Sequence, residues 1–148
     1  MSVTRRRVNE QLLQYWQKLK GQNQLPMEAE VDPDAISDIW DSCFMVRYES
    51  EDTEQAFRYI YLGQALVEAY GDDANEKEVC EKLAYPQNHE LAAQFHRVID
   101  SQEPQMVESE FTNSKGMLIK YRSCLLPLAK DNRNSAGYII GGMKWKAT

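Results

Sequence analysis

Apolar residues recur at intervals of three and four near the start of the chain, a spacing that gathers side chains on one face of an α-helix. The pattern predicts a helix over Asn9–Lys20, followed by Gly21, a residue type that commonly ends helices. The opposite face of this helix is polar, so its apolar stripe has to pack on something outside the helix. The residues of the stripe are Val8, Leu12, Trp16 and Leu19.

Five further segments are rich in the β-branched and aromatic residues that are typical of strands. The first two flank an acidic turn and predict a β-hairpin, and the last three are separated by short polar stretches that resemble turns. The predicted strands are Cys43–Tyr48, Phe57–Leu62, Gln105–Thr112, Met117–Leu128 and Ala136–Lys146.

Helical segments are predicted before and between these strands. A short one covers Asp34–Trp40, since Pro33 suits a first helical turn and Asp32 can cap it. Another short helix is centred near Leu66, and a longer one covers Asn88–Asp100. This order of elements predicts an α+β domain, with a five-stranded antiparallel sheet and helices gathered on one face.

Length and composition fit one folded domain. With 148 residues, of which 43% are hydrophobic and 27% charged, the chain can bury one substantial core. No apolar run approaches the roughly 18 residues that a membrane-spanning helix requires, and no signal-peptide core follows the N-terminal arginines. We therefore expect a cytoplasmic protein without membrane contact, in which the three cysteines are reduced.

The charge argues against nucleic-acid binding. A net charge of −6 repels a phosphate backbone, and the one basic run is Arg5 to Arg7, close to the N-terminus. Basic residues at a chain end are commonly solvated. We therefore interpret residues 1–8 as a basic flexible tail, and we expect no nucleic acid among the partners.

Several short stretches, in this order, resemble a known family. They are Leu12-Leu13-Gln14-Tyr15-Trp16, Leu25-Pro26, Val31-Asp32-Pro33, Phe57-Arg58-Tyr59, Leu62-Gly63, Ala65-Leu66, Tyr70-Gly71 and Leu126-Pro127-Leu128. Together with the element order they resemble the PAS fold, and in particular the fifth PAS family of bacterial proteins, over about residues 11–145. The resemblance implies a PAS fold: a five-stranded antiparallel sheet with a helical crossover on one face, here with an extra N-terminal amphipathic helix. It also implies a stand-alone sensory or regulatory module that acts in bacterial signalling by binding a small ligand or a protein.

The resemblance also divides the chain and indicates a ligand site. Residues 9–42 would form the N-terminal helix and linker, and residues 43–148 the PAS core. PAS folds hold ligands between the inner face of the sheet and the crossover, in a concave space that suits small apolar or aromatic molecules. Alternatively, the same side chains fill the space as a core, and the domain docks proteins instead. The predicted pocket residues are Tyr59, Tyr61, Leu66, Tyr70, Phe95, Ile119, Tyr121 and Ile139.

No cofactor and no catalytic activity are expected. PAS domains that bind haem use a histidine near the long helix, and His96 lies at the flank of the apolar face of that predicted helix. Flavin photosensors need a cysteine in an Asn-Cys-Arg signature, whereas Cys80 lies among carboxylates that disfavour a thiolate. Haem through His96, or flavin, is the alternative, and either would make the protein a redox or light sensor. Motifs such as HExxH and GxSxG do not occur.

The apolar stripe of the first helix leaves two alternatives for the partner. Uncovered, it would expose a patch that requires a partner, and PAS relatives often dimerise through such a helix. We therefore predict a homodimer formed through the four stripe residues. The alternative is that the helix folds back on its own sheet and covers Tyr138, Met143 or Trp145.

Overall fold

The computed structural model describes residues 8–49, 57–70, 89–113 and 115–148. Five strands form one antiparallel sheet in the order β2-β1-β5-β4-β3, so the last strand of the chain lies in the centre of the sheet, beside the first. All five predicted strands are confirmed to within one residue at each end. The strands are β1 (Cys43–Tyr48), β2 (Phe57–Leu62), β3 (Gln105–Thr112), β4 (Leu118–Ala129) and β5 (Ala136–Ala147).

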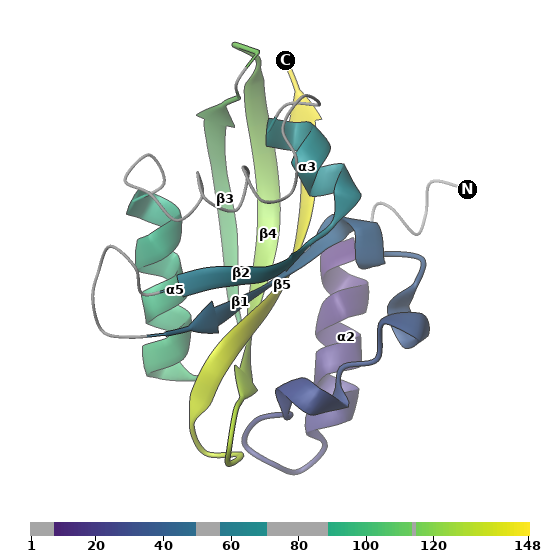
Figure 1. Cartoon of the computed structure of the whole chain (residues 1–148), viewed down its shortest axis with the longest axis vertical. Coiled ribbons are helices and arrows are strands. Elements are labelled where there is room, and N and C mark those ends of the chain that lie inside the picture. The colour runs from purple at the N-terminus through teal and green to yellow at the C-terminus, as the bar shows by residue number, and fades with distance from the viewer. Residues whose placement is uncertain (1–7, 50–56, 71–88, 114) are drawn as a thin grey trace.

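Helices lie on both faces of the sheet (Figure 1). The crossover helices α3 and α5 pack on one face, which we call the inner face, and the extra N-terminal helix α2 covers the other, which we call the outer face. Among the described residues, no helix has both the length and the apolar character needed to cross a bilayer. The helices are α2 (Val8–Lys20), α3 (Gln64–Tyr70), α5 (His89–Ser101) and the short 3-10 helices η1 (Glu28–Glu30), η2 (Pro33–Ile36) and η3 (Trp40–Ser42).

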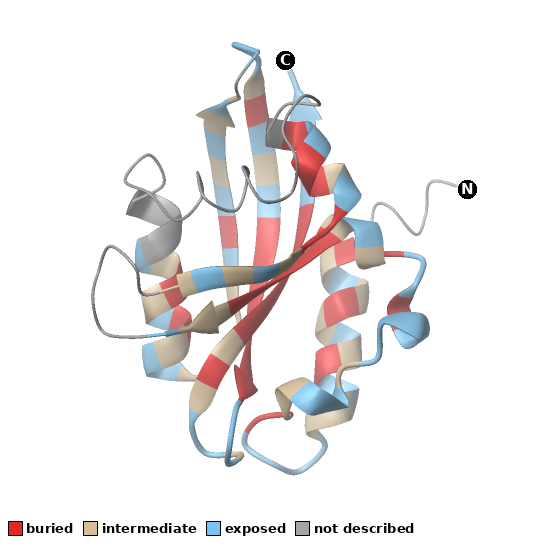
Figure 2. Cartoon of the chain, viewed as in Figure 1, coloured by how far each residue is buried: buried red, intermediate tan, exposed pale blue. Residues whose placement is uncertain are grey.

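Buried side chains form one hydrophobic cluster on each face of the sheet. Because successive residues of a strand point to opposite faces, β1, β4 and β5 contribute to both clusters. In β4, for example, Leu125 belongs to the inner cluster and Leu126 to the outer one. The central strands are therefore buried on both sides, and Figure 2 shows nearly continuous burial along their middle portions.

Two adjacent glycines in β5 let both layers approach the sheet closely. On the inner face, the ring of Phe44 lies where the Cβ of residue 141 would be, since Phe44 and Gly141 are cross-strand partners. On the outer face, a Cβ at Gly142 would lie 3.2 Å from Cγ1 of Val8 and 3.3 Å from Cδ2 of Leu12. Glycine in a strand commonly marks such a close approach. The two glycines thus provide space that an aromatic ring fills on one side and a helix fills on the other.

Helix α2 covers the chain's own sheet, so the predicted dimer interface is corrected. Val8, Leu12 and Trp16 are buried in the outer cluster, and Leu19 is half-buried. The indole Nε1 of Trp16 donates a 2.7 Å hydrogen bond to the carbonyl oxygen of Pro127 in β4. The folded-back alternative therefore describes the structure, because intramolecular packing already buries most of the stripe.

Of the three sheet residues considered beneath α2, only Tyr138 packs on the outer cluster. Met143 is buried in the inner cluster, and Trp145 packs against that cluster from its rim. The reason is strand alternation. Met143 and Trp145 follow Tyr138 by five and seven positions along β5, and residues an odd number of positions apart point to opposite faces. Those two residues therefore point to the opposite face.

The linker between α2 and β1 is tied to the sheet by polar contacts. The predicted helical segment over residues 34–40 is replaced by η2 and η3, and Oδ1 of Asp32 accepts a 3.0 Å hydrogen bond from the backbone N–H of Asp34 as the predicted cap. Arg133, in the turn between β4 and β5, forms a 2.8 Å ion pair with Glu30. Of the predicted tail over residues 1–8, Val8 is instead the buried first residue of α2, and residues 1–7 lie outside the described residues, as do Gly71 and Cys80.

Candidate functional site

Four aromatic rings meet on the inner face, where β1 and β2 meet α5. Phe95 of α5 is at the centre: its ring centroid lies 5.2 Å from that of Phe57, 6.1 Å from that of Phe44 and 6.3 Å from that of Tyr59. The rings are tilted or edge to face, geometries in which an aromatic pair contributes about 0.5–1.5 kcal/mol beyond its burial. We call this group, Phe44, Phe57, Tyr59 and Phe95, the aromatic cluster.

The local sequence explains why these rings converge. Phe57 and Tyr59 are two residues apart on β2 and therefore share a face of the sheet. Phe95 and Val98 are three residues apart on α5, and both are buried toward the inner face. Phe44 completes the group because Gly141 leaves room for its ring. The aromatic cluster therefore lies on the β2–β1 side of the inner face, against α5.

Six of the eight predicted pocket residues lie on the inner face, within one hydrophobic cluster or packed against it. They are Tyr59, Leu66, Phe95, Ile119, Tyr121 and Ile139. Four of the six are fully buried, and the two tyrosines are half-buried. A seventh, Tyr70, is the last residue of α3, but its side chain lies outside the described set.

The placement of Tyr61 corrects the eighth prediction. Met45 pairs with Tyr61, and Val46 pairs with Tyr59, so Ile60 is an extra residue in a β-bulge and is exposed. A bulge reverses the alternation of side chains, and Tyr61 therefore points to the outer face. There its ring stacks on Trp40 with centroids 4.2 Å apart. Its hydroxyl also donates a 2.8 Å hydrogen bond to the carbonyl oxygen of Trp40.

Two members of the aromatic cluster, Phe44 and Phe57, are missing from the predicted set. Phe57 could have been found from the sequence, because it lies two positions before Tyr59 on the same predicted strand. Phe44 carries no such signal, since its position depends on which strand pairs with β1. Only the cross-strand partnership with Gly141 shows that the ring of Phe44 lies over the sheet.

Polar contacts at the rim of the inner face attach α3 to the ends of the strands. The indole Nε1 of Trp145 in β5 donates a 3.0 Å hydrogen bond to the carbonyl oxygen of Ala65. The amide of Asn113, just after β3, donates a 3.1 Å hydrogen bond to the carbonyl oxygen of Ala69. Both acceptors are backbone groups of α3. The inner face is therefore closed at this end by a helix that the sheet itself holds in place.

The inner face offers little polar chemistry for a flavin. Among the described residues, Ser123 is the only buried polar side chain, and its hydroxyl donates a 2.7 Å hydrogen bond to the carbonyl oxygen of Gly142. The polar edge of a flavin ring needs hydrogen-bond partners when it is buried, because an unpaired buried polar group is costly. The described residues supply hydrocarbon and aromatic surface instead.

His96 lies at the edge of the aromatic cluster. Its ring meets that of Phe57 edge to face at 5.0 Å and that of Tyr48 at 6.1 Å. The residue is half-buried, and within the described part of the chain its buried Nε2 atom has no hydrogen-bond partner. Buried polar atoms normally have a hydrogen-bond partner, so among the described residues this nitrogen is the buried polar atom beside the aromatic cluster whose role has to be explained.

The two cysteines in the described residues are unreactive in their surroundings. Burial beneath α2 raises the pKa of Cys124 to about 12 and also raises the pKa of Cys43, which places both thiols in their protonated form at neutral pH. Cys43 and Cys124 both pair with Gly142, from opposite sides of β5. Two strand spacings, about 9–10 Å, separate their Cα atoms, which is beyond the span of a disulfide.

The strand order, with the last strand in the centre and two helices across one face, is that of a PAS-type domain. The sequence matches the PAS_5 family model, described as a PAS domain, over residues 4–143. The chain therefore belongs to this PAS domain family, as the resemblance predicts. A sequence comparison with curated proteins gave no match.

Solved structures share the fold at low sequence identity. The PAS domain of the fruit-fly ELK potassium channel is 14% identical with a TM-score of 0.52, and the match covers 78% of this chain and 97% of that one. The Rhodobacter sphaeroides LOV protein is 11% identical with a TM-score of 0.52, over 78% and 68% of the two chains. The RsLOV d2 variant is 13% identical with a TM-score of 0.55, over 76% of this chain and 65% of that one, just under two thirds of its length.

Proposed function

We propose that this chain is a PAS regulatory module of bacterial signalling that acts by binding a protein partner and catalyses no reaction. The observation that supports this proposal is the aromatic cluster. The ring of Phe44 lies on Gly141, with Tyr59 and Phe95 against it, at the place where PAS folds hold ligands. Rings packed in this way fill the space between α5 and the β2–β1 side of the inner face, so the domain would recognise its partner through its surface.

A signal could pass between the two faces through β5. Gly141 contacts the aromatic cluster on the inner face, and the next residue, Gly142, contacts α2 on the outer face. Packed interfaces rearrange between discrete states rather than deforming continuously. A partner that binds one arrangement of β5 more tightly would therefore shift the population on both faces.

Native mass spectrometry of protein purified from its host tests this proposal. We expect the mass of the polypeptide or of a whole multiple of it, a colourless solution, and no small molecule released on denaturation. A stoichiometric small molecule that leaves only when the protein unfolds would overturn the proposal.

The variant Phe44→Ala provides a matched control, because it opens a cavity in the inner face that we propose is filled in the unaltered protein. Removal of a buried ring leaves an apolar cavity, and such cavities bind small aromatic molecules. Indole should therefore raise the melting temperature of Phe44→Ala and leave the unaltered protein unaffected. An equal response of both proteins would show that the inner face is already open.

A small-ligand sensor is the second candidate, and His96 is the observation that favours it. A mainly apolar ligand with a single hydrogen-bonding group could pair with the buried Nε2 at the edge of the aromatic cluster. Haem is a special case, in which the same nitrogen would ligate the iron. Titration with haemin distinguishes haem from another small ligand. A shift of the Soret absorbance band that the variant His96→Ala abolishes would favour haem, and we expect no such shift. The homodimer and the cytoplasmic location stay predictions.

A further inference from the structure

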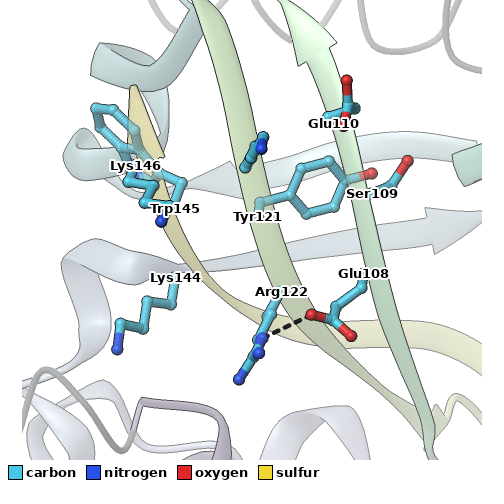
Figure 3. A pocket seen from close by; sticks show the side chains of 9 residues that line it. Glu108, Ser109, Glu110, Tyr121, Arg122, Lys144, Trp145 and Lys146 are labelled. Atoms are coloured by element: carbon cyan, nitrogen blue, oxygen red, sulfur yellow. Dashed lines mark hydrogen bonds and ion pairs between the residues drawn. The ribbon is translucent and has the colours of Figure 1, made fainter. Parts of the chain in front are cut away.

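Helix α2 leaves part of the outer face uncovered, toward the C-terminal end of β5. Three neighbouring strands there project charged side chains around a hollow of about 610 Å³ (Figure 3). We call this region the charged trough. Its charged residues are Glu108 and Glu110 from β3, Lys120 and Arg122 from β4, and Lys144 and Lys146 from β5.

The register of the strands arranges these six residues in two parallel rows. One row reads Glu108, Arg122, Lys144 across the strands, and the other reads Glu110, Lys120, Lys146. The residues between the rows, such as Tyr121 and Trp145, point to the inner face, so the floor of the trough is backbone. Each row thus runs from an acid at the edge of the sheet to two bases.

The charges are balanced at one end of the trough and unbalanced at the other. At the β3 end, Arg122 and Glu108 form a 2.8 Å ion pair, drawn as a dashed line in Figure 3. At the β5 end, Lys144 lies opposite Arg122, and Lys146 lies opposite Lys120. Like charges directly opposite one another destabilise a sheet. A chain with a net charge of −6 therefore concentrates positive charge at one place on its surface.

The start of α2 adds to this positive end. The side-chain amide of Asn9 donates a 3.2 Å hydrogen bond to the carbonyl oxygen of Arg122, which holds the first turn of the helix beside the trough. The N-terminus of a helix carries a partial positive charge of about half a unit. Glu10, in the same turn, is an exposed acid that offsets part of it. The helix terminus supports the lysines and is not a site by itself.

We infer that the charged trough binds an acidic segment of a protein partner. Three strands span about 10 Å from β3 to β5, which is the length of about three residues of an extended chain. Carboxylates of the segment would lie between Lys144 and Lys146, and an uncharged or basic residue would meet Glu108 and Glu110. This inference rests on the proposed function for its biological role, since it gives the chemistry of the partner.

Charge favours an acidic protein segment over a nucleic acid or an anionic membrane. A continuous polyanion would meet Glu108 and Glu110 at one end of the trough and the field of a chain with a net charge of −6 beyond it. A short segment with acidic residues at only one end avoids contact with Glu108 and Glu110 and carries less charge into that field. The asymmetry of the two rows is therefore the feature that selects the partner.

The test is fluorescence anisotropy with a fluorescein-labelled peptide, in which four consecutive glutamates are followed by four serines. We expect saturable binding that weakens as salt is added, because charge–charge contacts at an exposed site are screened. The double variant Lys144→Glu, Lys146→Glu should weaken binding by about tenfold or more, in line with the cost of placing like charges together in an interface. Its melting temperature should not fall, since the reversal also removes two like-charge pairs.

The matched control is Lys18→Glu, Lys130→Glu, which makes the same change in net charge at exposed positions outside the trough. This control should bind the peptide almost as well as the unaltered chain. Equal losses in the two double variants would show that net charge, rather than the trough, governs binding and would overturn the inference. Tighter binding of a single-stranded oligonucleotide or of phosphatidylserine vesicles would also overturn it.

The failure of this inference is distinguishable from the failure of the proposed function. If the peptide does not bind and native mass spectrometry shows only the mass of the polypeptide, the inference of an acidic partner fails and the proposed protein-binding function stands. If a small molecule is retained and the peptide still binds, the proposed function without a small ligand fails and the inference of an acidic partner stands.

Discussion

The same strands form both faces of the sheet, but the two faces are covered in different ways. On the inner face, the rings of the aromatic cluster and the apolar residues of α3 and α5 pack directly on β1, β4 and β5. On the outer face, α2 covers one part of the sheet, and the charged trough lies open beside it. A substitution on the inner face therefore changes packing, whereas one in the trough changes mainly surface charge. Both faces therefore contribute buried apolar contacts to stability, and only the outer face also carries an exposed cluster of charged side chains beside its covering helix.

The largest effect is expected on the inner face. Phe44 is 4% exposed and fills the space above Gly141. Replacement by alanine should lower the free energy of unfolding by about 3–5 kcal/mol, because it leaves a cavity that the rigid strands close poorly. Urea denaturation measures the change. Ile60→Ala is the control, since Ile60 is 45% exposed and its truncation should change stability by less than about 0.5 kcal/mol. Similar losses in both variants would contradict the comparison.

A smaller effect is expected where α2 meets the outer face. Trp16→Phe keeps most of the buried area but removes the donor that pairs with the carbonyl oxygen of Pro127. A buried acceptor left without a partner costs about 1–3 kcal/mol. Chemical denaturation followed by circular dichroism should show that loss, and light scattering should show an unchanged mass. A change in mass without a change in stability would instead return Trp16 to an intermolecular interface.

The elements of this fold follow largely from local patterns. The five strands and the helices α2 and α5 are predicted to within one residue at each end, because their runs of strand-forming residues and their helical stripes are local features of the sequence, whereas the helix predicted over residues 34–40 is divided into η2 and η3. The side to which α2 folds could not be predicted, because an amphipathic stripe looks the same whether it covers its own sheet or another chain. The bulge at Ile60 was equally hidden, since it depends on how β2 pairs with β1.

The same limit applies to the residues of the candidate sites, some of which follow from local patterns and some only from long-range strand pairing. Tyr59 and Phe95 are found from periodicity, but the role of Phe44 requires knowledge that Gly141 lies opposite it. In the trough, the alternation within each strand is visible in the sequence, as in Lys144-Trp145-Lys146. The register that aligns three such strands is not, because it arises from long-range pairing. Sequence patterns thus indicate which face of a strand or helix a residue occupies, but they do not show which residues of other elements lie beside it.

A third substitution should act in the opposite direction to the first two. Lys146→Glu replaces a like-charge pair with Lys120 by an opposite-charge pair at the same register. Cross-strand pairs of this kind contribute about 0.2–1 kcal/mol, so the variant should unfold at a slightly higher temperature than the unaltered protein. The increase should shrink as salt is added, because the pair is exposed. A decrease in stability would show that Lys146 has a packing role and would weaken the separation between the two faces.

The smallest effect is expected from a polar contact that holds the linker beside the outer face. The hydrogen bond from Arg133 lowers the pKa of Glu30 below its ordinary value of 4.5, helped by the backbone N–H of Met27 and opposed by partial desolvation. Because the folded-state pKa is the lower one, the contribution is fully present well above pH 4.5 and is lost as the pH falls through the folded value. Glu30→Gln should therefore lower stability at neutral pH by no more than about 1 kcal/mol, since the two side chains are 36% and 35% exposed and solvent screens the pair. The two proteins should converge in stability once the pH falls below the lowered folded-state pKa of Glu30, because both side chains are then uncharged. Thermal unfolding of both proteins across this range measures the difference, and a gap that persisted in acid would assign the effect of Glu30 to packing instead of charge.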